Sequence, residues 1–173
     1  AIHTFRASSS GDIILKNGLQ AKGKVNMKSS SSGDIEGGNV VCDVLVTEAS
    51  SSGDINLIKV ECTSLDVESS SSGDVLIKEL RAESVDAEAS SSGDVKLAGV
   101  CRSAQFSASS SGDVEAKNLK ADAVKANASS AGDITCYVVE TLDATTSSTG
   151  SVNYKGTPKY IDYHPKKGLN KID

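Results

Sequence analysis

The five residues Ser50-Ser51-Ser52-Gly53-Asp54 decide the fold of this chain, because they recur along most of its length. The same Ser-Ser-Ser-Gly-Asp stretch begins at Ser8, Ser30, Ser70, Ser90 and Ser109, and altered copies begin at Ser129 and Ser147. The glycines of successive copies lie 18 to 22 residues apart. Self-similarity at such a period is typical of a solenoid, in which each repeat packs on its neighbours.

Aligning the copies on their glycines produces columns of similar side chains. The second residue after the glycine is Ile or Val in every copy, and the fourth is mostly apolar. Counting back from the next glycine, the eighth and sixth residues are mostly apolar, and the fourth is always Ser, Ala or Thr. Within each group the inward residues alternate with outward ones, as in a β-strand. β-branched residues and glycine at fixed intervals disfavour helix.

Between one strand and the next, two successive inward residues are three positions apart and not two. This extra residue lets the chain turn a corner while its apolar side chains stay inside. One rung then contains three short strands, at Asp54 to Ile58, Lys59 to Cys62 and Ser64 to Ser69. Parallel crossover connections are overwhelmingly right-handed. The sequence therefore predicts an all-β fold, a right-handed parallel β-helix (solenoid) of about eight rungs of about 20 residues, with three short strands per rung.

The two ends of the chain depart from this pattern. We expect residues 1–153 to form the β-helix repeats, with a partial first rung at 1–10, and residues 154–173 to form a C-terminal cap. The chain starts inside a rung, so we expect a further rung or cap before Ala1. Two extra residues within Asn17 to Lys24 predict a bulge or a longer corner.

Composition argues against several classes of function. The net charge is −5 and there is no long run of Lys or Arg, which disfavours nucleic-acid binding. No apolar run approaches the roughly 18 residues that a transmembrane segment needs. Aromatic residues make up only 3% of the chain and Trp is absent, which is unusual for a carbohydrate site built on stacked rings.

The aspartates of the repeat are the leading candidate binding residues. Stacked rungs would place them on one edge, namely Asp12, Asp34, Asp54, Asp74, Asp94, Asp113 and Asp133. Such a ladder could bind calcium, because hard cations prefer clustered oxygens. The favoured interpretation is instead that each carboxylate accepts hydrogen bonds from turn amides and neighbouring serine hydroxyls. We therefore predict no metal site and no cofactor.

The cysteines and histidines offer no clear catalytic site. One column holds Cys42, Cys62 and Cys101 together with Ala82, Ala121 and Val139, so packing as buried free thiols is favoured over a Cys42–Cys62 disulfide. Cys136 lies in another inward column, and no Cys-x-x-Cys pair suggests zinc. His3 and His164 are the only histidines, and no Ser/His/Asp arrangement can be assembled. No catalytic residues are predicted.

Two outward surfaces are candidates for interaction. Acidic residues gather on one face, namely Glu48, Asp66, Glu68, Asp86 and Glu88. On another face, a candidate partner or self-association surface contains Ile14, Ile58, Leu76 and Tyr137 beside a column of lysines. The alternative is that these apolar residues are scattered singly over the surface, which is common.

The Ser-Ser-Ser-Gly-Asp-[Ile/Val] repeat and the terminal Gly-Ser-Val-Asn-Tyr-Lys-Gly-Thr-Pro at Gly150 to Pro158 resemble the head GIN domain of putative auto-transporter adhesins. These are exported proteins common in Bacteroidales, and the resemblance covers nearly the whole chain. Family members often have Gly-Ser-Gly-Asp where this chain has Ser-Ser-Gly-Asp. The resemblance implies a right-handed β-helix in an envelope or extracellular setting, and it supplies no catalytic residues.

These observations predict a non-catalytic, adhesin-like or structural protein of the cell envelope that binds a surface glycan or a protein partner. We expect it to be exported, to the periplasm, the outer membrane surface or the medium, and a homo-oligomer is possible. One alternative is a polysaccharide-active, pectinase-like enzyme, although rungs of nearly equal length leave no evident place for a cleft. Another is a self-assembling scaffold that polymerises through the N-terminal end or the face with Ile58 and Leu76.

Overall fold

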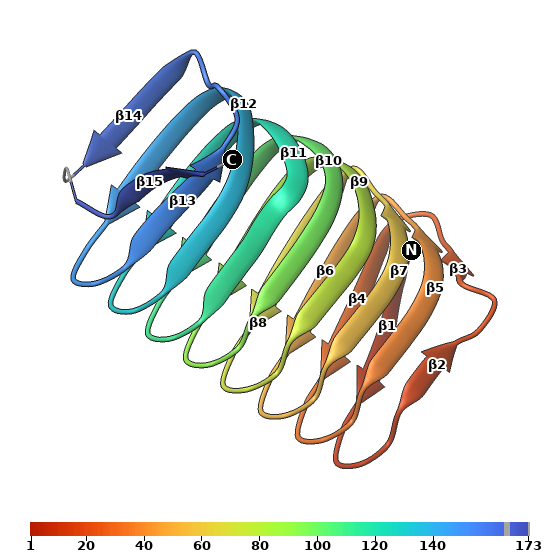
Figure 1. Cartoon of the computed structure of the whole chain (residues 1–173). Coiled ribbons are helices and arrows are strands. Elements are labelled where there is room, and N and C mark those ends of the chain that lie inside the picture. Colours follow the sequence, from red (N-terminus) through yellow and green to blue (C-terminus); the bar gives the residue numbers. More distant parts are fainter. Residues whose placement is uncertain (165–166, 173) are drawn as a thin grey trace.

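The computed structural model describes residues 1–164 and 167–172, and every regular element in them is a β-strand of one parallel sheet. The strands are β1 Ile2–Ala7, β2 Ile13–Leu15, β3 Leu19–Gln20, β4 Lys24–Ser29, β5 Ile35–Val41, β6 Val44–Ala49, β7 Ile55–Glu61, β8 Ser64–Ser69, β9 Val75–Ala89, β10 Val95–Ala108, β11 Asp113–Ala128, β12 Asp133–Thr146, β13 Ser151–Lys155, β14 Tyr160–His164 and β15 Leu169–Ile172. They wind into a β-solenoid of about eight turns, as the repeat predicts (Figure 1).

Each coil pairs in parallel with the coil above and below it. The early coils are split into separate strands, whereas β9, β10, β11 and β12 each run around most of a coil without interruption (Figure 1). β1, β4, β6 and β8 stack in order and lead to β9, while β2 and β3 pair with β5, which pairs with β7. The chain therefore advances by one coil with every copy of the repeat.

The register of pairing shows the corners that divide each coil into three sides. Between β7 and β9, Ile55 to Leu57 pair with the next coil, Ile58 is skipped, and pairing resumes at Lys59. A second break separates the end of β7 from Ser64, where β8 begins to pair with β9. The predicted strands at 54–58 and 59–62 are therefore the two halves of β7, and the predicted strand at 64–69 is β8.

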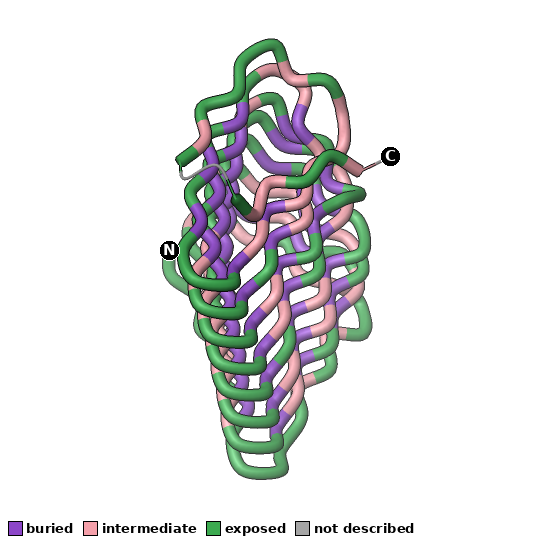
Figure 2. Tube along the Cα trace, turned by 60° about the vertical axis from the view of Figure 1, so that its left-hand side comes forward, coloured by how far each residue is buried: buried purple, intermediate pink, exposed green. Residues whose placement is uncertain are grey.

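The core is a narrow column of apolar side chains inside the solenoid. Figure 2 shows that buried residues recur in successive coils. The predicted inward columns are buried in the central coils, and the largest fully buried side chains include Phe106, Met27 and Leu80. The column four residues before each glycine uses small residues because it lies beside the turn. Where that residue is Ser29 or Ser69, its hydroxyl donates to the carbonyl oxygen of Gly33 or Gly73.

The serine turn depends on two residues for different reasons. In every turn the second serine has a positive φ of 55° to 61°, as in Ser51 and Ser71. The glycine does not have a positive φ, but its missing side chain lets successive turns approach closely. A Cβ added at Gly73 would lie 2.6 Å from the carbonyl oxygen of Gly53 in the coil before it.

Coils of unequal length adjust at their corners. In the first coil, Leu15 and Leu19 pair with Gly37 and Val40, so one additional residue sits at that corner. This confirms the longer corner predicted within Asn17 to Lys24. In the seventh coil, Val138 pairs with Ala121. The prediction that Val139 belongs to the column of Cys42, Cys62 and Cys101 is therefore wrong, and Val138 occupies that place. The reason is that the corner between Val138 and Thr141 holds one more residue than the corner between Ala121 and Ala123, which changes the count back from the next glycine.

The predicted cap at 154–173 adds further strands in the same parallel arrangement. β14 pairs with β12, and β15 pairs with β13. Tyr163 packs partly against the core, and its hydroxyl is 2.8 Å from Oγ1 of Thr146. Residues 165–166 and 173 of this segment lie outside the described residues. That the segment acts as a cap remains a prediction.

Candidate functional site

The aspartates of the repeat form a hydrogen-bonded ladder along the edge that follows the turns. The backbone amide of each aspartate donates to Oδ1 of the aspartate in the preceding coil, from Asp34 donating to Asp12 through Asp133 donating to Asp113. The N···O distances are 3.0, 2.9, 2.9, 2.9, 3.2 and 3.1 Å in chain order. At the end, the hydroxyl of Ser151 donates to Asp133 Oδ1 at 2.6 Å. Each carboxylate thus holds the start of the next coil.

The carboxylates of the ladder influence one another's ionisation. Partial burial raises the pKa of Asp54, Asp94 and Asp113 above the ordinary value. The amide hydrogen bond from the next coil lowers the pKa of each, and the neighbouring carboxylates raise it. The predicted turn interaction is therefore present, but its donors are amides of the following coil. In the part of the chain that the structure describes, Ser151 is the only serine whose hydroxyl donates to a ladder carboxylate.

Within residues 1–164 and 167–172, no group of three or more His, Cys, Asp or Glu side chains has an arrangement that could hold a metal ion. One oxygen of each ladder carboxylate already accepts a hydrogen bond, from a backbone amide in the first six and from the Ser151 hydroxyl at Asp133. The prediction that the ladder is a turn structure without a metal stays a prediction, and cation binding stays its alternative.

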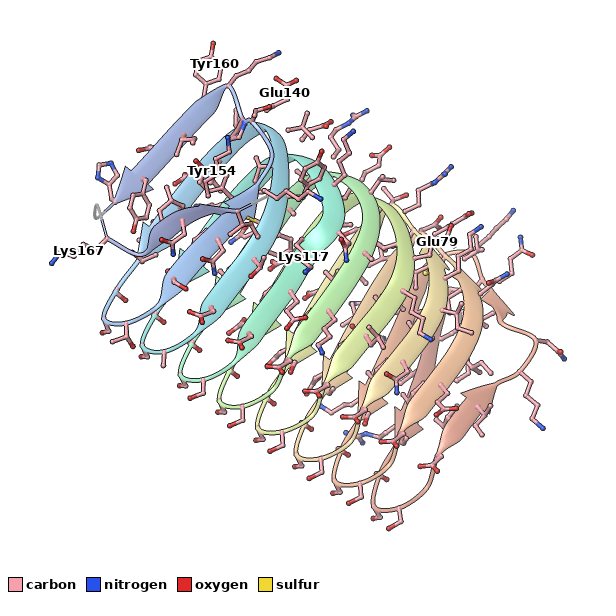
Figure 3. The ribbon with its side chains drawn as sticks, in the orientation of Figure 1. Glu79, Lys117, Glu140, Tyr154, Tyr160 and Lys167 are labelled. Atoms are coloured by element: carbon pink, nitrogen blue, oxygen red, sulfur yellow. The ribbon has the colours of Figure 1, made fainter. Side chains whose placement is uncertain are left out.

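A second feature is a trough of about 700 Å³ that runs along the side formed by β8, the ends of β9 to β12, and β14. Its floor carries small side chains in register, including Ser84, Ser103 and Ala123. The carboxylates of Asp66, Asp86, Asp143 and Asp162 line it together with Gln105 and Lys125. Tyr160, the first residue of β14, lies at its C-terminal end and is 72% exposed (Figure 3). The result is an open, acidic channel parallel to the solenoid axis.

Like charges stack in register beside this trough. Asp66 pairs with Asp86, and Glu68 pairs with Glu48 on one side and Glu88 on the other. Partial burial, followed by repulsion from Glu48 and Glu88, raises the pKa of Glu68. Partial burial, followed by repulsion from Asp66 and Glu88, raises the pKa of Asp86. The predicted acidic face is therefore confirmed in its position. Among the residues that the structure describes, Glu48 is the only member of this face with an ion pair, to Lys28 at 2.6 Å.

Comparison with known families identifies the chain. Residues 1–96 and 48–158 match the family described as "Putative auto-transporter adhesin, head GIN domain". The chain belongs to this family. Membership implies an exported, cell-surface protein, and it confirms the family that the repeat and the Gly150 to Pro158 stretch predict.

Two solved structures are similar to this GIN domain. A putative adhesin from Bacteroides fragilis is 27% identical with a TM-score of 0.55, over 86% of this chain and 57% of that one. A putative lipid binding protein from Parabacteroides distasonis is 23% identical with a TM-score of 0.63, over 87% of this chain and 61% of that one. The chain thus spans about three fifths of the length of these proteins, and the second likeness shows the fold alone. No curated protein matches the chain.

The predicted interaction surface of the GIN domain is only partly contiguous. Ile14 and Ile58 are 57% and 56% exposed, and both line one shallow depression with Leu76. Tyr137 lies several coils away, where the ammonium of Lys155 is 5.2 Å from its ring centroid. The structure therefore brings three of these four residues together.

The cysteines and histidines are placed largely as the columns predict. All four cysteines are free, and burial raises the pKa of Cys42 to about 11 and of Cys62, Cys101 and Cys136 to about 12. His3 pairs with Val25, in the inward column, but it is exposed because it belongs to the first coil. His164 contacts Asp162 at 3.1 Å, with both side chains exposed.

The trough was missed by reasoning from the sequence. Its signal is the outward column nine residues before each glycine, where Ser64, Ser84, Ser103, Ala123 and Thr141 stand. Small outward residues look like ordinary surface positions. They form a channel only because the acidic column beside them and Tyr160 rise above them.

Proposed function

We propose that this GIN domain is a non-catalytic adhesive module of the cell envelope that binds a linear surface glycan along the trough. The single observation that carries the proposal is the trough itself, which is continuous across six strands of the solenoid. Six parallel strands spaced about 4.8 Å apart give it a length of about 24 Å. A groove of this length suits an extended polymer better than a compact metabolite.

The chemistry of the trough fits sugar hydroxyl groups. Carboxylates such as Asp86 and Asp143 can each accept two hydrogen bonds, and Gln105 can both donate and accept. Small residues on the floor leave the channel open to a ring, and the exposed Tyr160 offers an apolar face for stacking at one end. Because aspartates outnumber the single lysine of the lining, neutral or amine-bearing glycans are favoured over uronic acids.

The experiment is binding of the purified chain to an array of neutral, amino and uronic glycans, each with calcium and with chelator. We expect saturable binding to a neutral or amino glycan, weakened by Tyr160→Ala and by Asp86→Asn. Tyr137→Ala is the matched control, since it removes an aromatic ring from another side of the solenoid. Binding that survives both trough variants, or no binding at all, contradicts the proposal.

Two other outcomes of the same assay separate the remaining alternatives. Loss of binding with chelator would assign a cation-binding role to the aspartate ladder. A shortened glycan product would show a polysaccharide-active enzyme, contrary to the non-enzymatic function that the family suggests.

A further inference from the structure

The charged residues along one wall of the trough are unevenly distributed. This wall is the column of outward residues seven positions before each repeat glycine, continued on β14. Pairing between the coils places them in the order Asp66, Asp86, Gln105, Lys125, Asp143 and Asp162. Two carboxylates therefore come first, an amide and an ammonium lie in the middle, and two carboxylates come last.

The first two carboxylates have no cation of their own. Asp66 on β8 lies in register with Asp86 on β9, about 4.8 Å along the solenoid, and we call these two residues the first acidic pair. Glu68 and Glu88 lie in register beside them, two residues further along the same strands. Among the described residues, neither member of the first acidic pair forms an ion pair. The pair therefore presents unbalanced negative charge to the trough.

The carboxylates at the other end differ, because each has a basic side chain beside it. Asp143 lies in register with Lys125, and a carboxylate oxygen of Asp162 is 3.1 Å from Nε2 of His164. Lys125 also places a positive charge in the middle of the trough, two coils after Asp86. The trough is thus most acidic where it crosses β8 and β9.

We propose that the first acidic pair selects a free, protonated amine on the sugar unit that lies across β8 and β9, so that the ligand is an amino-sugar polymer and not a neutral one. This inference rests on the proposed function, because the trough supplies the binding site and the pair supplies only its selectivity. An ammonium group donates three hydrogen bonds, and charge-assisted bonds to carboxylates are about twice as strong as neutral ones. A hydroxyl or an N-acetyl group at the same place would leave both carboxylates without a cation.

Lys125 sets the opposite preference further along the trough. It lies two strand spacings, about 10 Å, from Asp86, with Gln105 between them. A free amine at Lys125 would meet a like charge, whereas an uncharged amide or hydroxyl group can both donate to and accept from the side chain of Gln105. Amines are therefore favoured over β8 and β9 and disfavoured over β11.

Calorimetric titration of the full chain with three hexasaccharides of the same linkage tests this selectivity. Their units are glucosamine, N-acetylglucosamine and glucose, and the pH is mildly acidic so that the amines are protonated. We expect the glucosamine hexasaccharide to bind about tenfold more tightly than the other two. Asp86→Asn should bring this ratio close to one. Glu79→Gln is the matched control and should keep the ratio, because exposed Glu79 pairs in register with Lys59, outside the trough lining (Figure 3).

A variant of Lys125 should act in the opposite direction. Lys125→Gln removes the positive charge from the middle of the trough, so it should strengthen binding of the glucosamine hexasaccharide. Binding of the glucose hexasaccharide should stay nearly the same. A gain in affinity also shows that the variant is folded.

A covalent cross-link locates the amine in the native chain. A water-soluble carbodiimide activates a carboxylate, and an amine of the bound glucosamine hexasaccharide then forms an amide with it and displaces a urea. Mass spectrometry of peptides should find the sugar on Asp66 or Asp86. Glu79 and Asp54 should stay unmodified by it.

The outcomes separate this inference from the proposed function. Equal binding of the three hexasaccharides, weakened by Tyr160→Ala, overturns the selectivity for an amine and leaves the trough as the glycan site. An amine preference that survives Asp86→Asn, or a cross-link outside the first acidic pair, also overturns it, because attraction to the net charge of −5 would then suffice. No binding of the glucosamine hexasaccharide overturns it as well, and the glycan array then decides the proposed function.

Discussion

The backbone amide of Asp74 donates a 2.9 Å hydrogen bond to Oδ1 of Asp54, one coil earlier. Asp54→Ala removes this acceptor and should lower the free energy of unfolding by about 1 kcal/mol. Asp54→Asn keeps a carbonyl oxygen and should cost less. The measurements are urea midpoints and hydrogen exchange of the Asp74 amide, which should accelerate in the alanine variant. Asp143→Ala, outside the ladder, serves as the control, and equal midpoints for all three variants would contradict a structural role for the ladder.

The glycine of each later turn is required because the turn of the preceding coil lies against it. Gly73→Ala would place a Cβ 2.6 Å from the carbonyl oxygen of Gly53, and such overpacking typically destabilises by about 1–3 kcal/mol. Gly11 belongs to the first turn, where the nearest atom to an added Cβ is 3.6 Å away. We therefore expect Gly11→Ala to leave the thermal midpoint almost unchanged. Equal losses in the two variants would mean that backbone conformation, and not stacking, requires the glycine.

The second serine of the turn occupies a conformation that glycine adopts more easily. Ser51 has a φ of 61°, in the left-handed region that costs an L-residue about 1–2 kcal/mol. We expect Ser51→Gly to raise the urea midpoint and Ser51→Val to lower it. Ser52→Gly is the matched control and should be neutral or destabilising, because Ser52 does not have a positive φ. A gain from Ser52→Gly equal to that from Ser51→Gly would refute the conformational argument.

This position also shows why the sequence was so informative about the fold. The Gly-Ser-Gly-Asp form of the repeat, common in the family, places its first glycine where this chain has Ser51. The same turn and the same inward columns occur in every copy of the repeat. A single exception, such as Thr47 in a mostly apolar column, therefore does not obscure the pattern. Strand alternation then assigns almost every core residue, and Phe106 and Leu142 are buried as the columns predict.

The sequence did not predict which columns of outward residues lie next to one another around a coil. The acidic residues Asp66 and Asp86 were predicted to stack, and they do. That they border a channel with Ser84 depends on where the second corner turns and how far the side chains project. Corner geometry also explains the error at Val139, since counting back from a glycine fails in a coil whose intervening corner holds an extra residue.

Glu68 provides a test of the stacked charges through pH. Its pKa in the folded chain is raised above the ordinary value of 4.5, chiefly by partial burial and then by Glu48 and Glu88. A raised pKa means that the folded state binds the proton more tightly than the unfolded state does. Stability from this group is therefore full below the ordinary pKa and is lost as pH rises through the folded pKa. Glu68→Gln should raise the urea midpoint at pH 7 and have little effect near pH 4; a loss of stability at pH 7 would contradict this account.

The cysteines offer a probe of the intact core. Burial raises the pKa of Cys101 and Cys136 to about 12, so almost no thiolate is present at neutral pH, and both side chains are buried. We expect iodoacetamide to label Cys136 at pH 8 only when urea unfolds the chain, as measured by mass spectrometry of peptides. Cys62 is partly exposed and should react sooner than Cys136. Rapid labelling of Cys136 in the folded protein would mean that the seventh coil opens readily, and would argue against a continuous core at that end.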